Sequence, residues 1–174
     1  MPTWAAIVDA LCANPHPLVS ERLIGLLDHQ REEVREAAAR GLGRLRSPAA
    51  LRPLLDVTSD PSSLVRAAII EAIGRYPVRA AFEALRLALT DDHEKVRLAS
   101  LVALAVRQEP EIEEILLVQG LGDSDLWVRY RAAEALGVRR AMAALPALAL
   151  IAKSDREPSF LRRIAVEALG QLGD

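Results

Sequence analysis

Residues 123–137 read DSDLWVRYRAAEALG, and this stretch decides how the rest of the chain is interpreted. Val128, Ala132 and Leu136 recur at i, i+4 and i+8, the spacing that places side chains on one face of a helix. The Val-Arg pair within it occurs five times, with Leu in place of Val in the last copy. Its arginines are Arg35, Arg66, Arg97, Arg129 and Arg162, at spacings of 31, 31, 32 and 33 residues. Five copies in phase indicate a repeat architecture.

Each copy is followed by a second apolar helix. A glycine follows the first helix in four of the five copies, at residues 43, 74, 137 and 170, where a left-handed helix end is expected. Asp60, before Pro61, and Asp123, ahead of Trp127, are expected to cap first helices. The second helices are predicted at 48–57, 79–89, 110–119 and 140–152, and a further helix pair at about 3–13 and 18–27.

Two helices in each repeat predict an all-α fold, a right-handed α-solenoid of about five and a half two-helix repeats with eleven helices. We expect one domain over residues 1–174. Its predicted parts are an N-terminal helix pair (1–29), four repeats (30–59, 60–90, 91–122 and 123–155) and a C-terminal half repeat (156–174). The composition agrees, because 30 Ala and 28 Leu make up a third of the chain and favour helix over strand.

The repeated pattern is Asp-x-x-x-x-Val-Arg-x-x-Ala-x-x-Ala-Leu-Gly, followed by a turn and an Ala/Leu helix. It resembles the short HEAT-like repeats first named from phycobilin lyase subunits, and the stretch from Asp123 to Gly137 matches best. The resemblance covers the chain from Asp28 onward. It implies a solenoid whose second helices line the concave face. It leaves the activity open, because that family includes lyases, hydroxylases, adaptors and assembly factors.

Charge and composition exclude several classes of protein. The formal net charge is −2, so no general basic field is present to hold nucleic acid or an anionic membrane. Cys12 is the only cysteine, which excludes an intramolecular disulfide. The first residues lack the basic region of a signal peptide, and the longest apolar runs are far shorter than a membrane span. We therefore expect a cytoplasmic location.

An aspartate lies five or six residues before the Val or Leu of each pair. We expect each arginine to bind an aspartate at the turn of the same or the preceding repeat. Such a ladder would set the register in which repeats stack, and partial burial would favour Arg over Lys. The predicted ladder residues are Asp28, Arg35, Asp60, Arg66, Asp91, Arg97, Asp123, Arg129, Asp155 and Arg162.

The second helices carry the candidate binding face. When they are aligned on the preceding glycine, or on Ala105 in the repeat at 91–122, the eighth and eleventh positions after it are predicted to face inward. These are Leu51/Leu54, Phe82/Leu85, Glu113/Leu116 and Leu145/Leu148. The thirteenth position, about 140° from this stripe, holds Asp56, Leu87, Val118 and Leu150.

Three of these four residues are apolar and are edged by charged side chains, which predicts a shallow groove for an apolar peptide or helix. The candidate partner-binding residues are Arg52, Glu83, Arg86, Leu87, Glu114, Val118, Leu150 and Lys153. The alternative is that these side chains pack laterally between neighbouring second helices. The turn at 107–114, RQEPEIEE, departs from the pattern of the other repeats. It is either a solvated acidic helix start or a docking spot for a basic partner.

No catalytic, metal or cofactor site is predicted. The histidines, residues 16, 29 and 93, lie in three different repeats without ligand spacing. The iron-dependent deoxyhypusine hydroxylases, one branch of the resembled family, carry His-Glu directly after Val-Arg, whereas the His93-Glu94 pair here precedes Val96. The densest basic group, at residues 129–140, is opposed by acidic second helices, which weakens a nucleic-acid role. Both tryptophans are attributed to packing.

The favoured function is a non-catalytic scaffold that binds another protein or a peptide through the second-helix face. The alternatives are a subunit of a phycobilin-lyase-like enzyme and a nucleic-acid-binding HEAT-like protein. The sequence stops where the repeat requires a second helix. The last helix, with Phe160, Ile164 and Leu169, is therefore expected to leave an apolar flank uncovered. This predicts either a longer parent protein or self-association through that helix.

Overall fold

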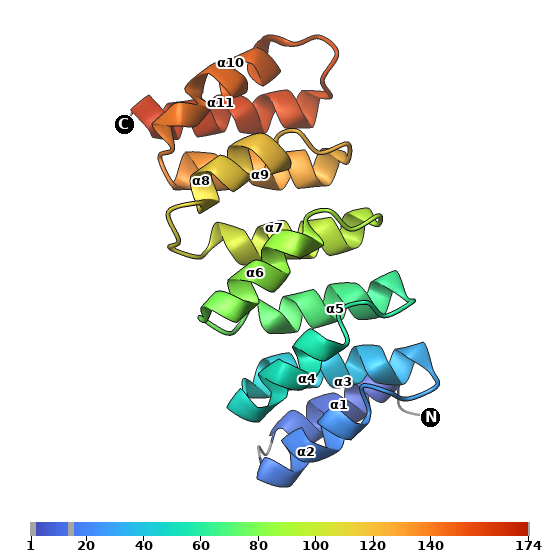
Figure 1. The fold of residues 1–174 in the computed structure, drawn as a ribbon. Helices are drawn as coiled ribbons and strands as arrows, with labels where there is room; N and C mark the ends of the chain where they lie inside the picture. Colours follow the sequence, from blue (N-terminus) through green and yellow to red (C-terminus); the bar gives the residue numbers. More distant parts are fainter. Residues whose placement is uncertain (1–2, 14–15, 174) are drawn as a thin grey trace. The chain divides into compact units, whose positions relative to one another are not determined.

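The computed structural model describes residues 3–13 and 16–173, which contain only helices and the turns that join them. The chain divides into two compact units, Met1–Ala103 (unit 1) and Leu104–Asp174 (unit 2). The helices alternate between first and second members of each repeat (Figure 1). The fold class is therefore all-α, in the two-helix repeat pattern of an α-solenoid, as the sequence predicts.

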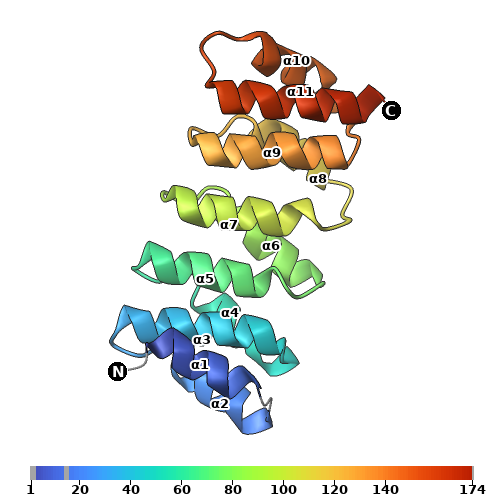
Figure 2. The ribbon, with the colours of Figure 1, turned by 180° about the vertical axis from the view of Figure 1, so that it is seen from behind.

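Unit 1 contains the N-terminal helix pair and the first repeats. Its helices are α1 (Trp4–Ala13), α2 (Pro17–Gly25), α3 (Glu32–Leu45), α4 (Leu51–Asp56), α5 (Ser63–Ile73) and α6 (Arg79–Ala88), with the start of α7 (Glu94–Ala105). A short 3-10 turn, η1 (Pro48–Ala50), leads into α4. Helix α3 packs between α1 and α5, and α4 and α6 pack on α5 (Figure 2).

Unit 2 repeats this arrangement. Its helices are α8 (Ile112–Ile115), α9 (Leu126–Val138), α10 (Leu145–Lys153) and α11 (Ser159–Gly173). A π-helical turn, η2 (Leu116–Gly120), continues α8, and a 3-10 turn, η3 (Met142–Ala144), precedes α10. Helix α11 packs against both α9 and α10.

The second helices bury a different pair of positions from the one predicted. The seventh and eleventh residues after the aligned glycine or Ala105 are fully buried in every second helix: Ala50/Leu54, Ala81/Leu85, Ile112/Leu116 and Ala144/Leu148. At the eighth position only Phe82 is fully buried, while Glu113 and Leu145 are exposed. The predicted eighth position was therefore wrong, because residues four apart align on one helix face and the i, i+4 pair faces the first helices.

The repeated glycines do not end their helices in a left-handed conformation. No glycine among the described residues has a positive φ, and the left-handed residues are Arg46 and Arg140. Gly43 is needed instead because a Cβ there would lie 2.9 Å from the Cα of Ala72 on the next first helix. The glycines at 74 and 137 meet neighbouring helices in the same way. Close helix approach, and not helix termination, therefore requires these glycines.

The π turn η2 accommodates the extra residue of the repeat at 91–122. Arg66 follows the buried Leu54 by twelve positions, whereas Arg129 follows the equivalent Leu116 by thirteen. The π turn begins at Leu116, where Leu121 donates its N–H to the Leu116 carbonyl at 3.0 Å. One added residue is what an i→i+5 turn takes up, so the buried face of this helix stays in register.

The expected caps are displaced by two residues. The N-caps of α5 and α9 are Ser62 and Asp125, and not Asp60 and Asp123. Asp60 and Asp123 instead accept the N–H of the residue two positions on, at 2.8 and 2.7 Å, as Asx turns.

Candidate functional site

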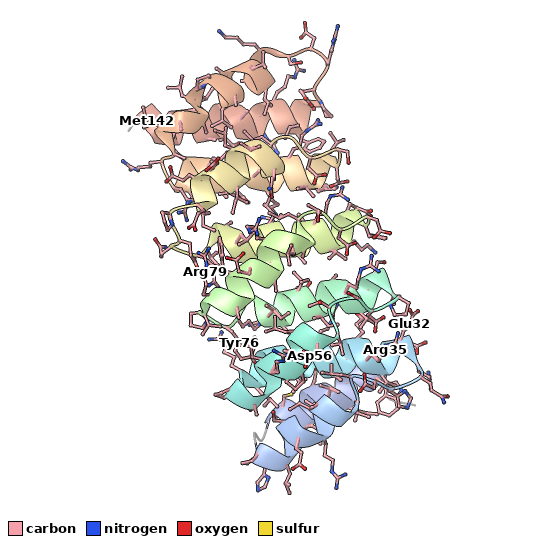
Figure 3. All side chains as sticks on the ribbon, in the orientation of Figure 1. Glu32, Arg35, Asp56, Tyr76, Arg79 and Met142 are labelled. Carbon is pink, nitrogen blue, oxygen red and sulfur yellow. The ribbon has the colours of Figure 1, made fainter. Side chains whose placement is uncertain are left out.

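In unit 1, the repeated arginines Arg35 and Arg66 form hydrogen bonds both to the turn that precedes them and to the turn that follows them. Arg35 donates from Nε and Nη2 to the two carboxylate oxygens of Asp60, at 2.6 and 2.9 Å. Arg66 makes the same bidentate pair with Asp91, at 2.8 and 2.7 Å. Figure 3 labels Arg35 at the start of α3. In both pairs the acceptor belongs to the following repeat, so the expected pairing with the same or preceding repeat was wrong for Arg35 and Arg66.

The direction of this pairing follows from a second contact. Arg35 Nη1 donates to the His29 carbonyl at 2.8 Å, and Arg66 Nη1 donates to the Asp60 carbonyl at 3.1 Å. Arg97 also contacts the carbonyl six residues before it, at 3.1 Å. Each of these arginines therefore reaches its own turn through backbone carbonyls. In Arg35 and Arg66, the remaining face of the guanidinium then points to the next repeat.

The carboxylates of this pairing in unit 1 are more acidic than usual. Burial raises the pKa of Asp60, but hydrogen bonds from Arg35 and from the Ser62 N–H outweigh it, and the pKa lies below its ordinary value. The same balance of burial against the Arg66 and His93 N–H bonds lowers the pKa of Asp91 to about 2. Both carboxylates are therefore ionised at neutral pH and act as stacking contacts.

The two ends of the predicted ladder differ from its middle. Arg129 pairs with Glu157 at 2.5 Å, whereas Arg162 makes the expected contact with Asp155 at 3.4 Å, where Asp155 is fully exposed. The longer loop between α10 and α11 places Glu157 where the other repeats place an aspartate. At the other end, Arg35 reaches its own turn through the backbone carbonyls of His29 and Gln30, and not through Asp28.

The candidate binding residues of unit 1 lie along α4 and α6. Leu87 is 66% exposed and forms part of the rim of a cavity of about 630 Å³, which we call the α4–α6 cavity. Leu55 of α4 and Ala84 of α6 line its sides, and the buried Ile70 and Val96 form its floor. The cavity is open to solvent and largely apolar, which is the lining that an apolar side chain requires.

Charged side chains border the α4–α6 cavity. Glu83 accepts from Arg86 at 3.0 Å and from Arg79 at 2.7 Å, and the Arg86 hydrogen bond lowers the pKa of Glu83. Arg52 pairs with Asp56, which is labelled in Figure 3, at 3.0 Å, and both side chains are more than half exposed. These exposed pairs contribute little to stability, so they are free to exchange for contacts with a partner.

The candidate residues of unit 2 lie on α8, on the π turn and on α10. Val118 is 63% exposed and Leu150 is 73% exposed. Glu114 borders a smaller cavity of about 230 Å³, which Leu117 and Leu136 also line. Lys153, at the end of α10, is exposed. Leu87, Val118 and Leu150 are all largely exposed, at 66%, 63% and 73%. They fall into two sets, one in each unit.

An aromatic cluster at the start of α9 and α11 was not predicted. The Trp127 ring stacks on Phe160 with 5.4 Å between centroids, and Tyr130 packs edge-on at 5.7 Å. Trp127 is nevertheless 59% exposed, so packing accounts for it only in part. The scarcity of aromatics, 3% of the chain, was the signal that could have drawn attention to it.

The last helix is covered on one side. Ile164 is buried, whereas Phe160 and Leu169 are partly exposed and Val166 is 57% exposed. The apolar flank that the sequence predicts therefore excludes Ile164, which points toward the helices that α11 packs on. Self-association through this helix stays a prediction.

The three histidines all act at helix starts. The Nδ1 atoms of His16, His29 and His93 each accept the backbone N–H two residues on, at 3.2, 3.1 and 3.2 Å. Within the described ranges, no three His, Cys, Asp or Glu side chains gather as metal ligands would. Over the same residues, no helix is both long and apolar enough to cross a bilayer.

The stacked helix pairs define the class as an α-helical repeat protein, and comparison with known proteins gives the family. The family of HEAT repeats matches residues 4–74, 51–116 and 113–174, and the chain therefore belongs to the HEAT-repeat family. No curated protein matches it. The narrower likeness to phycobilin-lyase repeats stays a prediction.

Several solved structures share the fold. A designed armadillo repeat protein in complex with the peptide (KR)4 is 21% identical, with a TM-score of 0.69 over 95% of this chain and 85% of the other. An engineered protein is 18% identical, with a TM-score of 0.65 over 97% and 88% of the two chains. Human deoxyhypusine hydroxylase is 23% identical over 98% and 68%, but at a TM-score of 0.47 it carries no argument about function.

Proposed function

We propose that this chain is a non-catalytic interaction scaffold that binds a peptide segment of another protein on its second-helix faces. The α4–α6 cavity of unit 1 is the primary contact. The observation that carries the proposal is Leu87, a large apolar side chain two-thirds exposed at the rim of a cavity of about 630 Å³. Exposed apolar surface beside a cavity is typical of interaction sites. The designed armadillo protein bound to a peptide shows that a similar fold supports this use.

Binding would work by insertion. An apolar side chain of the peptide enters between Leu55 and Leu87 and rests on Ile70 and Val96. The cavity walls are helices that pack on α5, so little ordering is needed before the peptide binds, and this lowers the entropic cost. In unit 2, Val118 and Leu150 offer exposed apolar contacts of the same kind. We place the protein in the cytoplasm.

Selection from a random peptide library displayed on phage tests the proposal without a known partner. We expect enrichment of peptides with a large apolar anchor, and loss of their binding in Leu87→Asp, which puts a charge at the cavity rim. Leu64→Asp is the matched control, because Leu64 is also an exposed leucine of unit 1 but lies on α5 outside the cavity lining. Equal loss in both variants, or no enrichment, would refute the proposal.

The double variant Leu87→Asp with Val118→Asp extends the test to both units. Because both side chains are exposed, we expect its circular dichroism spectrum and melting temperature to match those of the wild type while partner binding is lost. Unfolding of the double variant would show that these residues are packing contacts and would contradict the assignment.

A further inference from the structure

A notch lies between α3 and α5, two first helices that lie side by side in unit 1 (Figure 2). Its volume is about 180 Å³. Its floor consists of Gly43, Ala68 and Ala72, the small residues at which the two helices approach most closely. With so little side chain in the floor, a small ligand in the notch would lie directly against the helices.

Three arginines line the notch. Arg40 and Arg44 lie one turn apart on α3, and Arg75 follows α5. Arg40 pairs with Glu36 at 2.9 Å, and Arg44 pairs with Asp9. Arg75 is exposed and has no ion-pair partner among the residues that the structure describes.

The acids around the notch do not block it. Glu71 is the acidic side chain in its lining, and it is exposed. The Arg40 and Arg44 pairs leave about half of each arginine side chain accessible to solvent. Surface pairs of this kind are weak, so an anion that accepts from several guanidinium groups at once would displace them.

The equivalent place in unit 2 shows that the repeat does not require these arginines. Alignment of the Val-Arg copies places Glu134, Val138 and Gln171 where unit 1 has Arg40, Arg44 and Arg75. There the Gln171 side chain closes the space, since its Oε1 lies 2.5 Å from where a Cβ on Gly137 would be. The same helix packing forms with no arginine at any of the three positions, so the arginines of unit 1 need another explanation.

We propose that the α3–α5 notch is a binding site for a phosphate monoester. A phosphate monoester carries close to two negative charges at neutral pH and three terminal oxygens, which match three guanidinium groups. A carboxylate has two oxygens and one charge and would leave one arginine unused. The notch has a volume of about 180 Å³, so a phosphate group fits in it and the rest of a larger ligand lies outside it. This site is separate from the α4–α6 cavity and does not depend on the proposed function.

Isothermal titration calorimetry at low salt tests the proposal with four probes: a short phosphoserine peptide, the same peptide with serine, inorganic phosphate and duplex DNA. We expect the phosphoserine peptide to bind and the serine peptide not to bind. Arg75→Gln should weaken the phosphopeptide by at least about tenfold. Glu71→Gln, which removes the nearby negative charge, should strengthen it. Arg163→Gln is the control, an exposed first-helix arginine of unit 2 in an i,i+4 ion pair.

The probes also identify the source of the phosphate. Competition by inorganic phosphate, lost in Arg75→Gln, would support a site that recognises the phosphate group alone. Binding of the phosphopeptide without such competition would support a site that also needs the peptide. The proposal would be overturned by three results: no binding of either phosphate probe, an equal effect of Arg163→Gln, or DNA binding that Arg75→Gln weakens as much as it weakens phosphopeptide binding.

Discussion

Replacing Arg66 by methionine removes the guanidinium that joins two repeats of unit 1 while keeping most of the aliphatic side chain. Arg66 donates to both oxygens of Asp91, to Asp92 at 2.6 Å and to the Asp60 carbonyl at 3.1 Å. In Arg66→Met, the Asp91 carboxylate keeps the His93 N–H as a hydrogen-bond donor at 2.9 Å. The variant therefore leaves a half-buried charge without its cation.

The expected loss lies between two known limits. Removing one partner of a fully buried ion pair costs about 3–5 kcal/mol, and an exposed pair contributes about 0–1 kcal/mol. The side chains of Arg66 and Asp91 are 14% and 15% exposed, so we expect about 2–3 kcal/mol, between the two limits.

The pH dependence of this loss has a defined sign. The folded-state pKa of Asp91 is about 2 and lies below the usual 3.8, because the Arg66 and His93 hydrogen bonds outweigh the opposing effect of burial. A lowered carboxylate pKa stabilises the fold above the unfolded pKa, and this stabilisation is lost as the pH falls through the folded pKa. The difference between wild type and Arg66→Met should therefore shrink as the pH falls from about 4 toward about 2.

Urea denaturation followed by circular dichroism measures the loss at neutral pH and through the acidic range. Arg162→Met is the control at the same repeat position, because Arg162 is 39% exposed and its partner Asp155 is fully exposed at 3.4 Å. Arg162→Met should change the free energy of unfolding by less than about 0.5 kcal/mol. Equal losses in the two variants, or a pH-independent loss in Arg66→Met, would refute the argument from burial.

Three further predictions rest on packing. Gly43→Ala should lower the unfolding free energy by about 1–2 kcal/mol, because the added Cβ meets the next helix. Gly170→Ala, with open space around it, should raise the unfolding free energy by about 0.5–1 kcal/mol. A gain of stability in both variants, measured by urea denaturation, would contradict the close approach at Gly43. Leu148→Asp should prevent folding while Leu150→Asp leaves the melting temperature within a few degrees, and similar melts would refute the assigned burial. Burial raises the pKa of Cys12, so iodoacetamide should alkylate it more slowly in the folded chain than in urea, which mass spectrometry would show; equal rates would contradict it.

The repeat positions show what can be inferred without coordinates. The helix pairs were predictable because apolar residues recur at helical spacing and in phase, as around Val128 and Leu136. The inward position of the second helices was wrong by one residue, at Glu113 and Leu145, because the sequence alone does not show which i, i+4 pair faces the first helices. The glycines were wrongly assigned to helix ends, because the sequence alone does not show that a neighbouring helix lies against them.

The candidate site was likewise predictable only in part from the sequence. Leu87 could be singled out by its place in the repeat, but its exposure and the α4–α6 cavity depend on how α4 and α6 lie on α5. The notch of Arg40, Arg44 and Arg75 gave no sequence signal, because its residues are up to 35 positions apart and come together only when α3 packs on α5.

The sequence by itself determined the all-α class, the number of helices and the repeat period, because these depend on local helical spacing that recurs in phase. Only the tertiary structure decided which repeat each arginine joins, why the glycines are needed and where cavities open. Those properties depend on distances between helices of different repeats. The partner of Arg35 lies 25 residues further along the chain, and no local pattern specifies whether a side chain points to the turn behind it or the turn ahead.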